Sequence, residues 1–336
     1  MVLTQSEILM LYVIFTGLMG LAILIYVILD GYDLGVGMLM MEADDQEKDR
    51  MIASIGPFWD ANETWLVLGV GILLVAFPKA HGIILTALYI PVAVMLGGLI
   101  LRGVAFDFRA KARDAHKARW DKAFMVGSTL ATFAQGYMLA QYVMGLENTR
   151  AVFLFGVLAG VSLMSAYRLV GAAWLIMKTE GELQKKSIRW ARRALWGTVV
   201  GIVVVSILTP WMSPRIFNKW FSFPMFYYLA TIPLLTGALI LMLEIVLRRL
   251  PYPNDRYCWL PFAGTVSVFI LGFAGLAYSF YPYIIPNQMT IWEGGTAPTS
   301  LAIILIGALI VLPFIMGYTL FSYRVFWGKV RDLRYD

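Results

Sequence analysis

Long runs of apolar residues alternate with short polar connections along this chain, and each run is about 20 residues long. That is the length an α-helix needs to cross the hydrocarbon core of a bilayer. The runs that fit this description are residues 8–29, 53–78, 81–101, 123–146, 152–177, 195–211, 224–247, 259–281 and 300–323. The second run is unusual because it carries acids, and the sixth is short. The pattern predicts an all-α polytopic membrane protein with about nine transmembrane helices.

The connections between the runs predict how the helices are arranged. All of them are short, and no linker or low-complexity stretch interrupts the chain. Short connections favour antiparallel neighbours. We therefore expect residues 1–336 to form a single transmembrane domain, in which eight of the nine helices could make two four-helix bundles.

Composition supports this class of protein. The chain is 60% hydrophobic and only 14% charged, whereas a soluble domain is nearer to half apolar and a quarter charged. The net charge of +6 does not indicate nucleic-acid binding, because the basic residues form short clusters between apolar runs. A single cysteine, Cys258, excludes a disulfide framework and a cysteine-based metal site.

The positions of Lys and Arg predict the orientation in the membrane. Alternate connections hold 22 of the 27 basic residues: segments 42–51, 102–122, 178–193, 248–256 and 324–336. Cytoplasmic connections are enriched in Lys and Arg. The expected topology therefore has the N-terminus outside, in the periplasm, and the C-terminus in the cytoplasm.

Acidic residues gather at the cytoplasmic side of this topology. The first helix is expected to end at "LDGYDLGVG", which places Asp30 and Asp33 in a Gly-rich turn at the boundary. The stretch "GPFWDANETWL" places Asp60 and Glu63 one turn apart in the cytoplasmic half of the second helix. A carboxylate in hydrocarbon costs several kcal/mol unless it is paired, protonated or in contact with water. The acids therefore need an explanation.

Two interpretations account for the acids. Nearby carboxylates favour protonation of one of them, so the group could form a proton-conducting inlet from the cytoplasm. Alternatively, the acids offset helix macrodipoles and Arg102 is a structural partner. We favour the second interpretation for Asp30 and Asp33, and the first for Asp60, which Trp59 and Trp65 flank.

Further charges and loops have simpler explanations. The third helix ends at "LRGVAFDFR", which adds Asp107 and Arg109 as structural charge partners beside Arg102. Arg168 and Glu244 can extend to the membrane surface, although Arg168 could also pair with Glu244 or Asp60. Segment 178–193 reads as a basic amphipathic interfacial helix, and segment 281–300 as a re-entrant or capping loop at the outer face.

No redox or hydrolytic centre is evident in the chain. The only histidines are His81, in the outer turn where the third run begins, and His116, in a charged cytoplasmic connection, and neither resembles an axial haem ligand. No Walker, Rossmann or HExxH motif occurs. If the chain serves an enzyme, we expect it to do so as a subunit, without a metal site of its own.

Four motifs together resemble a known family. They are "LDGYDLGVG", "PFWDANETWL", "LRGVAFDFR" and "YPYIIPNQMTIWEGG" followed by "PFIMGYTLFSYRVFWGK". They are similar to those of subunit II of cytochrome bd-type quinol oxidases, in order and over the whole chain. The wording "PFWDANETW" is closest to the cyanide-insensitive branch. In the enterobacterial form a Gln stands at the position of Glu63, which favours Asp60 as the shared acid.

The resemblance implies a haem-free subunit of an enzyme in the bacterial inner membrane. A homologous subunit I would carry the b- and d-type haems and the quinol site, and the complex would reduce dioxygen to water with cytoplasmic protons. The implied fold is two four-helix bundles plus one peripheral helix. Asp60 would lie on a proton path, with Asp33, Arg102 and Asp107 in the same region or important for haem stability. A structural quinone and a small single-span subunit are further partners that the resemblance admits.

Two other functions remain as alternatives. A proton-coupled transporter would also use buried acids, but such carriers often have matching broken helices in two halves, and no matching Gly or Pro interruption is evident. A purely architectural oxidase subunit would use its acids only to stabilise helix ends.

Overall fold

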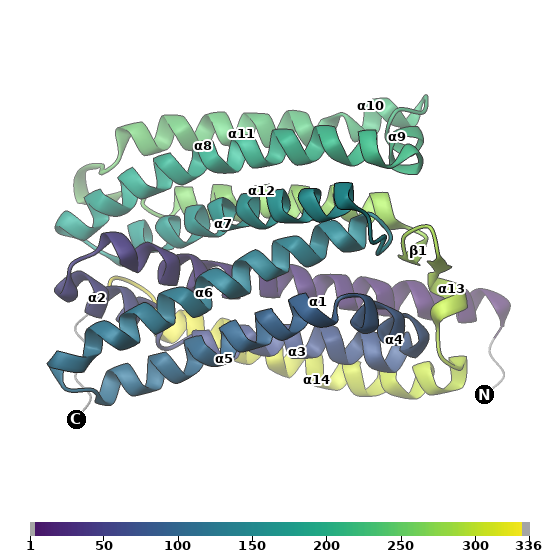
Figure 1. Ribbon diagram of the computed structural model, residues 1–336, viewed down its shortest axis with the longest axis horizontal. Helices are drawn as coiled ribbons and strands as arrows, with labels where there is room; N and C mark the ends of the chain where they lie inside the picture. Colours follow the sequence, from purple (N-terminus) through teal and green to yellow (C-terminus); the bar gives the residue numbers. More distant parts are fainter. Residues whose placement is uncertain (1–3, 331–336) are drawn as a thin grey trace.

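The computed structural model describes residues 4–330, apart from the side chains of residues 114 and 115, and this part of the chain is almost entirely helical (Figure 1). The long helices are α1 (Gln5–Leu39), α3 (Trp59–Ala76), α5 (Tyr89–Lys111), α6 (Asp114–Val143), α7 (Arg150–Lys178), α8 (Gly181–Met212), α11 (Thr231–Arg249), α12 (Leu260–Phe280) and α14 (Pro298–Val325). The short elements are η1 (Met40–Glu42), α2 (Asp45–Ile55), α4 (Pro78–Ala87), α9 (Pro214–Trp220), α10 (Met225–Leu229), η2 (Pro253–Asp255), β1 (Tyr283–Ile285), β2 (Met289–Thr290) and α13 (Ile291–Gly294).

The long helices lie side by side along the longest axis of the molecule, and α1 begins at the end opposite to where α14 finishes (Figure 1). Within residues 4–330, eight helices are long and apolar enough to cross a membrane. Helix α6 is not among them. The prediction of an all-α polytopic membrane protein is confirmed, whereas nine spans and the orientation stay predictions.

Helix α1 is the centre of the helix packing. It packs against α3, α6 and α7, while α5 packs on α6. A second group forms where α7, α8, α11 and α12 contact one another. These contacts fit the predicted pair of four-helix bundles.

The first helix does not end where the sequence suggested. It continues as a regular α-helix to Leu39, so Asp30 and Asp33 lie inside the helix and not in a turn. The glycines serve packing: a Cβ atom on Gly35 would lie 1.9 Å from the Tyr167 carbonyl oxygen of α7. Close approach of α1 to α7 requires Gly there. This correction places both acids in the interior.

Other boundaries also differ from expectation. The second run divides into α2 and α3 with a break at residues 56–58, where Pro57 has no backbone N–H to donate and Phe58 leaves the helical conformation (φ −121°, ψ −32°). The third run divides into α4 and α5, and α5 extends to Lys111. The expected interfacial helix at 178–193 is wrong, since most of it is the start of the continuous helix α8.

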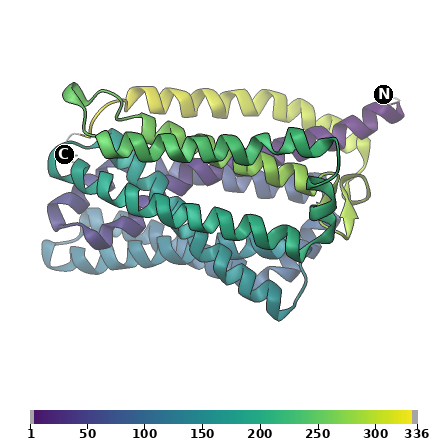
Figure 2. The same ribbon diagram turned by 90° about the horizontal axis from the view of Figure 1, so that it is seen from above.

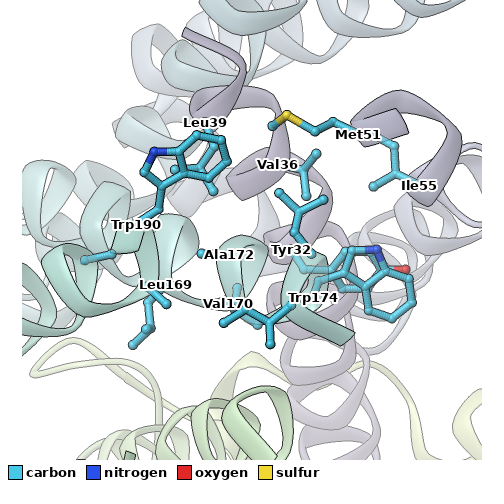
Figure 3. Packing of buried hydrophobic residues seen from close by; sticks show 14 of the residues in the cluster. Tyr32, Val36, Leu39, Met51, Ile55, Leu169, Val170, Ala172, Trp174 and Trp190 are labelled. Atoms are coloured by element: carbon cyan, nitrogen blue, oxygen red, sulfur yellow. The ribbon is translucent and has the colours of Figure 1, made fainter. Parts of the chain in front are cut away.

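The largest hydrophobic core lies where α1, α2, α7 and α8 meet, as Figure 3 shows. The ring of Tyr32 stacks on Trp174 with centroids 4.2 Å apart. Met51 and Ile55 of α2 belong to the same core. Helix α2 therefore packs on the bundle and covers the end of α1 that carries the acids.

Helix α14 is an outer helix. It forms one edge of the bundle in both views (Figures 1 and 2), and its apolar window is the least buried of the eight candidate spans. Leu301 is its only buried residue. Its remaining apolar side chains are available to lipid or to a partner.

The segment 281–300 forms a cap at the end where the chain begins. Strands β1 and β2 pair as an antiparallel hairpin and α13 follows. The hydroxyl group of Tyr12 donates to the Thr296 carbonyl oxygen at 3.0 Å, and hydrogen bonds from Thr290 lower the pKa of Glu293. Of the two expected forms, the structure has the capping loop.

Candidate proton-transfer site

Arg102 on α5 is the centre of a buried charge cluster. Its side chain is 1% exposed and donates to Asp30 of α1 at 2.6 Å and to Glu63 of α3 at 3.2 Å. Asp30 is fully buried, whereas the Glu63 side chain is 29% exposed. One guanidinium group therefore joins three helices and links a buried carboxyl group to a partly exposed one.

Asp33 lies one turn beyond Asp30 on α1 and is also fully buried. Its partner is neutral: Asn62 of α3 donates from Nδ2 to Asp33 Oδ2 at 2.8 Å. The same nitrogen lies 2.8 Å from the Tyr32 hydroxyl oxygen. Among the described residues no cation forms an ion pair with Asp33. The Asp33 carboxyl group is therefore stabilised by the Asn62 amide, which also contacts the Tyr32 hydroxyl group, and not by a cation.

The cluster has more carboxyl groups than cations. Arg102 pairs with Asp30 and Glu63 and leaves Asp33 without a cation, and the buried atoms Asp30 Oδ2, Asp33 Oδ1 and Arg102 Nε have no hydrogen-bond partner within the described chain. Buried charge without compensation is costly. An assembly of this kind can hold a proton on one carboxyl group and exchange it with another.

A neutral hydrogen-bond chain continues from the cluster into the bundle. Tyr26 lies one helical turn before Asp30 on α1, and its hydroxyl group accepts a hydrogen bond from Gln135 Nε2 at 2.7 Å. The Tyr167 hydroxyl group donates to Gln135 Oε1 at 2.8 Å. Helices α6 and α7 thereby contribute polar groups that the motifs did not single out.

Asp60 lies apart from this cluster. It is in the first turn of α3, is exposed, and its carboxylate forms no hydrogen bond or ion pair with the part of the chain described. The Arg102 guanidinium carbon lies 5.8 Å from the centroid of the Trp59 ring, and the Phe106 ring packs against Trp59 with centroids 4.8 Å apart. Trp65 points elsewhere, into the contact with Tyr26 on α1. The stretch "WDANETW" therefore places Asn62 and Glu63 in the cluster and Asp60 on the surface.

The two other predicted charge partners do not join Arg102. Asp107 is exposed and makes no ion pair within residues 4–330. Arg109, two turns along α5, binds Asp121 at 2.5 Å and Asp49 at 2.8 Å. The expectation of one shared charge group is wrong, because Arg109 lies two turns, about 10 Å, further along the same side of α5 and meets other acids there.

The predicted alternatives for Arg168 are also wrong. Arg168 pairs with Glu42, whereas Glu244 binds Arg248 at 2.6 Å and Arg192 at 3.5 Å. All these residues lie at the end of the bundle where α1 finishes. Because Glu42 of η1 also pairs with Arg193 of α8 at 3.3 Å, these ion pairs connect η1 to α7 and α8, and α8 to α11.

A comparison with known proteins decides the family. The family model described as cytochrome bd terminal oxidase subunit II matches residues 11–326. This chain belongs to that family. It is a multi-pass bacterial membrane protein, and it is a subunit of an oxidoreductase complex.

Individual relatives agree with this membership. Cytochrome bd ubiquinol oxidase subunit 2 of Bacillus subtilis (strain 168) is 27% identical over 321 residues, covering 90% of this chain and 91% of the relative. Cytochrome bd-I ubiquinol oxidase subunit 2 of Escherichia coli (strain K12) is 27% identical over 360 residues, covering 93% of each. A chain of the bd oxidase from Geobacillus thermodenitrificans has the same fold, with a TM-score of 0.79 at 16% identity over 94% of this chain and 98% of that one.

Proposed function

We propose that this chain is the haem-free subunit II of a bd-type quinol oxidase and supplies a cytoplasmic proton-uptake path. A haem-bearing subunit I would hold the b- and d-type haems, oxidise quinol and reduce dioxygen to water. A structural quinone and a small single-span subunit would be additional partners. Residues 1–336 would act as one transmembrane domain with a periplasmic N-terminus.

One observation carries the proton-path part of the proposal. The carboxyl groups of Asp30, Asp33 and Glu63 converge around one guanidinium group, and they extend from full burial to partial exposure. Intramembrane acids that face the interior of a bundle are characteristic of proton relays. Glu63 is the member of this set that is partly exposed at the surface of the chain.

Each residue then has a distinct role. Glu63 takes up a proton at the surface, and Asp30 and Asp33 hold it in the interior. Arg102 does not release a proton, because a guanidinium group stays charged in proteins. It compensates the negative charge and keeps the Glu63 and Asp30 carboxyl groups close to each other. Asp60, exposed at the start of α3, is placed to exchange a proton with a partner subunit or with water.

The same contacts also favour a purely architectural function. Arg102 joins α1, α3 and α5 through buried ion pairs, and such pairs can hold helices in register. In that case the carboxyl groups would be needed for assembly and not for proton transfer. Measuring assembly and turnover separately in variants of these carboxyl groups distinguishes the two functions.

The experiment uses the purified two-subunit complex with Glu63→Gln or Asp60→Asn. The amides keep the shape of the side chains but cannot carry a proton in the same way. We expect at least a tenfold loss of oxygen-reduction turnover for Glu63→Gln, within the range that proton-transfer groups contribute, while the haem spectrum is unchanged. Because the enterobacterial form has Gln at this position, the use of Glu63 would be specific to chains that carry an acid here. Asp60→Asn tests the contribution of the surface acid separately.

Glu147→Gln is the matched control, because Glu147 is an exposed acid in the connection between α6 and α7, far along the chain from the cluster. Normal turnover in both acid variants would rule out the proton path but not the family. Loss of the haem spectrum together with turnover would favour the architectural function.

A further inference from the structure

The C-terminal end of α14 returns to the acid cluster. The Tyr323 hydroxyl oxygen lies 2.6 Å from that of Tyr32, and the Tyr323 hydroxyl group donates to Asn62 Oδ1 at 3.2 Å. The ring of Tyr323 stacks on Phe58, just before α3, with centroids 4.5 Å apart. An otherwise exposed helix thus makes a specific polar contact at this one end.

The segment after α14 is fastened to the junction of α7 and α8. Lys178 Nζ donates to the Phe326 carbonyl oxygen at 2.6 Å, and Lys329 Nζ donates to the Thr179 carbonyl oxygen at 2.9 Å. The backbone N–H of Val330 donates to the Lys178 carbonyl oxygen at 2.8 Å. These bonds anchor the chain directly beyond Tyr323, so its hydroxyl group has a defined position.

The neighbours of Asn62 select one orientation of its amide. Nδ2 faces three oxygens that can accept from it: Asp33 Oδ2 at 2.8 Å, the Tyr32 hydroxyl oxygen at 2.8 Å and the Leu29 carbonyl oxygen at 3.4 Å. Oδ1 receives the Tyr323 hydroxyl group. An amide has its donors on one atom and its acceptor on the other, so Tyr323 favours the orientation in which the N–H groups point at Asp33.

We propose that Tyr323 is a positioning residue for Asp33. Tyr323 acts through Asn62, because it keeps the amide N–H groups of Asn62 directed at the Asp33 carboxyl group. Without this hydroxyl group the amide can rotate and present its oxygen to Asp33, which then bonds only if Asp33 carries a proton. Tyr323 thereby sets how Asp33 holds a proton. The positioning itself stands on geometry, whereas its effect on turnover rests on the proposed proton path.

The test is Tyr323→Phe in the two-subunit complex, which removes the hydroxyl group and keeps the stacked ring. Infrared spectroscopy follows the carboxyl band of Asp33, identified by its disappearance in Asp33→Asn. We expect the band to shift, because its hydrogen bond from Asn62 is weakened. We also expect turnover to fall roughly twofold to tenfold, the consequence of losing one hydrogen bond.

Tyr318→Phe is the matched control, because Tyr318 lies on the same helix and is exposed; it should leave the Asp33 band unchanged. A second variant carries 3-fluorotyrosine at position 323, which keeps the ring and makes the hydroxyl group a stronger donor. In this variant the Asp33 band should shift in the opposite direction. If Tyr323→Phe does not assemble, the 3-fluorotyrosine variant alone tests the positioning. An Asp33 band that moves in neither variant would overturn the proposal. A shifted band with normal turnover would support positioning and argue against the proton path.

Discussion

At the scale of single residues, Arg102 determines whether the acid cluster can exist. It is almost fully buried and is the only cation that forms an ion pair with Asp30 within the described part of the chain. Removing one partner of a buried pair leaves an uncompensated charge. The free-energy cost of that charge is much larger than the stabilisation that the intact pair contributes. The cluster is therefore more sensitive to loss of Arg102 than to loss of one carboxyl group.

We expect Arg102→Met to destabilise the protein by about 3–5 kcal/mol, because Asp30 stays buried without a cation. Adding Asp30→Asn to this variant should recover part of the loss, since the uncompensated charge is removed. Thermal unfolding of the complex and the yield of assembled complex measure both effects. Arg150→Met, at an exposed position at the start of α7, should have little effect. Equal stability of the Arg102 and Arg150 variants would contradict the role of the buried pair.

At the scale of elements, the contact between α1 and α7 positions the site. Gly35 of α1 faces Gly171 of α7, and each approaches the backbone of the other helix. This small-residue contact brings α7 close to α1 beside both interior aspartates, and the ring of Tyr167 packs at Gly31, between them. The glycines that suggested a turn in the sequence instead permit close helix packing.

Gly35→Ala should destabilise the protein by at least about 1–3 kcal/mol, because the new methyl group must push the helices apart. The matched variant is Gly17→Ala on the same helix, where an added Cβ meets no atom within 4 Å. It should be neutral or slightly stabilising, because Ala favours helix over Gly. Thermal unfolding and assembly yield compare the two variants. If both have the same effect, close α1–α7 packing does not depend on Gly35.

At the scale of the whole molecule, the arrangement implies two chemically different ends. The end where α1 finishes carries the ion pairs of Arg102, Arg109 and Arg168. The opposite end carries the hairpin cap and exposed aromatic residues such as Tyr228. Basic residues mark the cytoplasmic side, so the acid cluster should open toward the cytoplasm.

Cysteine labelling in intact cells tests this orientation. In a Cys258→Ser background, Tyr228→Cys should react with a membrane-impermeant maleimide from outside, because it is exposed at the hairpin end. Lys185→Cys, exposed at the start of α8, should react only after the membrane is opened. The reverse labelling pattern would invert the topology and place the cluster on the outer side.

The site was only partly predictable from the sequence. The motifs brought Asp33, Glu63 and Arg102 to attention, but Asp107 was expected to join them and does not. Helical phase explains this, because a difference of a few residues turns a side chain to another face. Tyr323 lies within the closing motif, but the sequence did not indicate its contact with Asn62, since that contact joins residues that are far apart in the chain.

The sequence by itself determined the class of protein, because apolar runs of spanning length have no other stable placement than a membrane, and in a membrane each must satisfy its own backbone as a helix. It also determined the family, through motifs that lie in order along the chain. Only the tertiary structure decided that α1 continues past Asp33, that Glu63 and not Asp60 contacts Arg102, and that α14 closes the cluster. These outcomes depend on which helix faces come together, and that is a property of packing among distant segments.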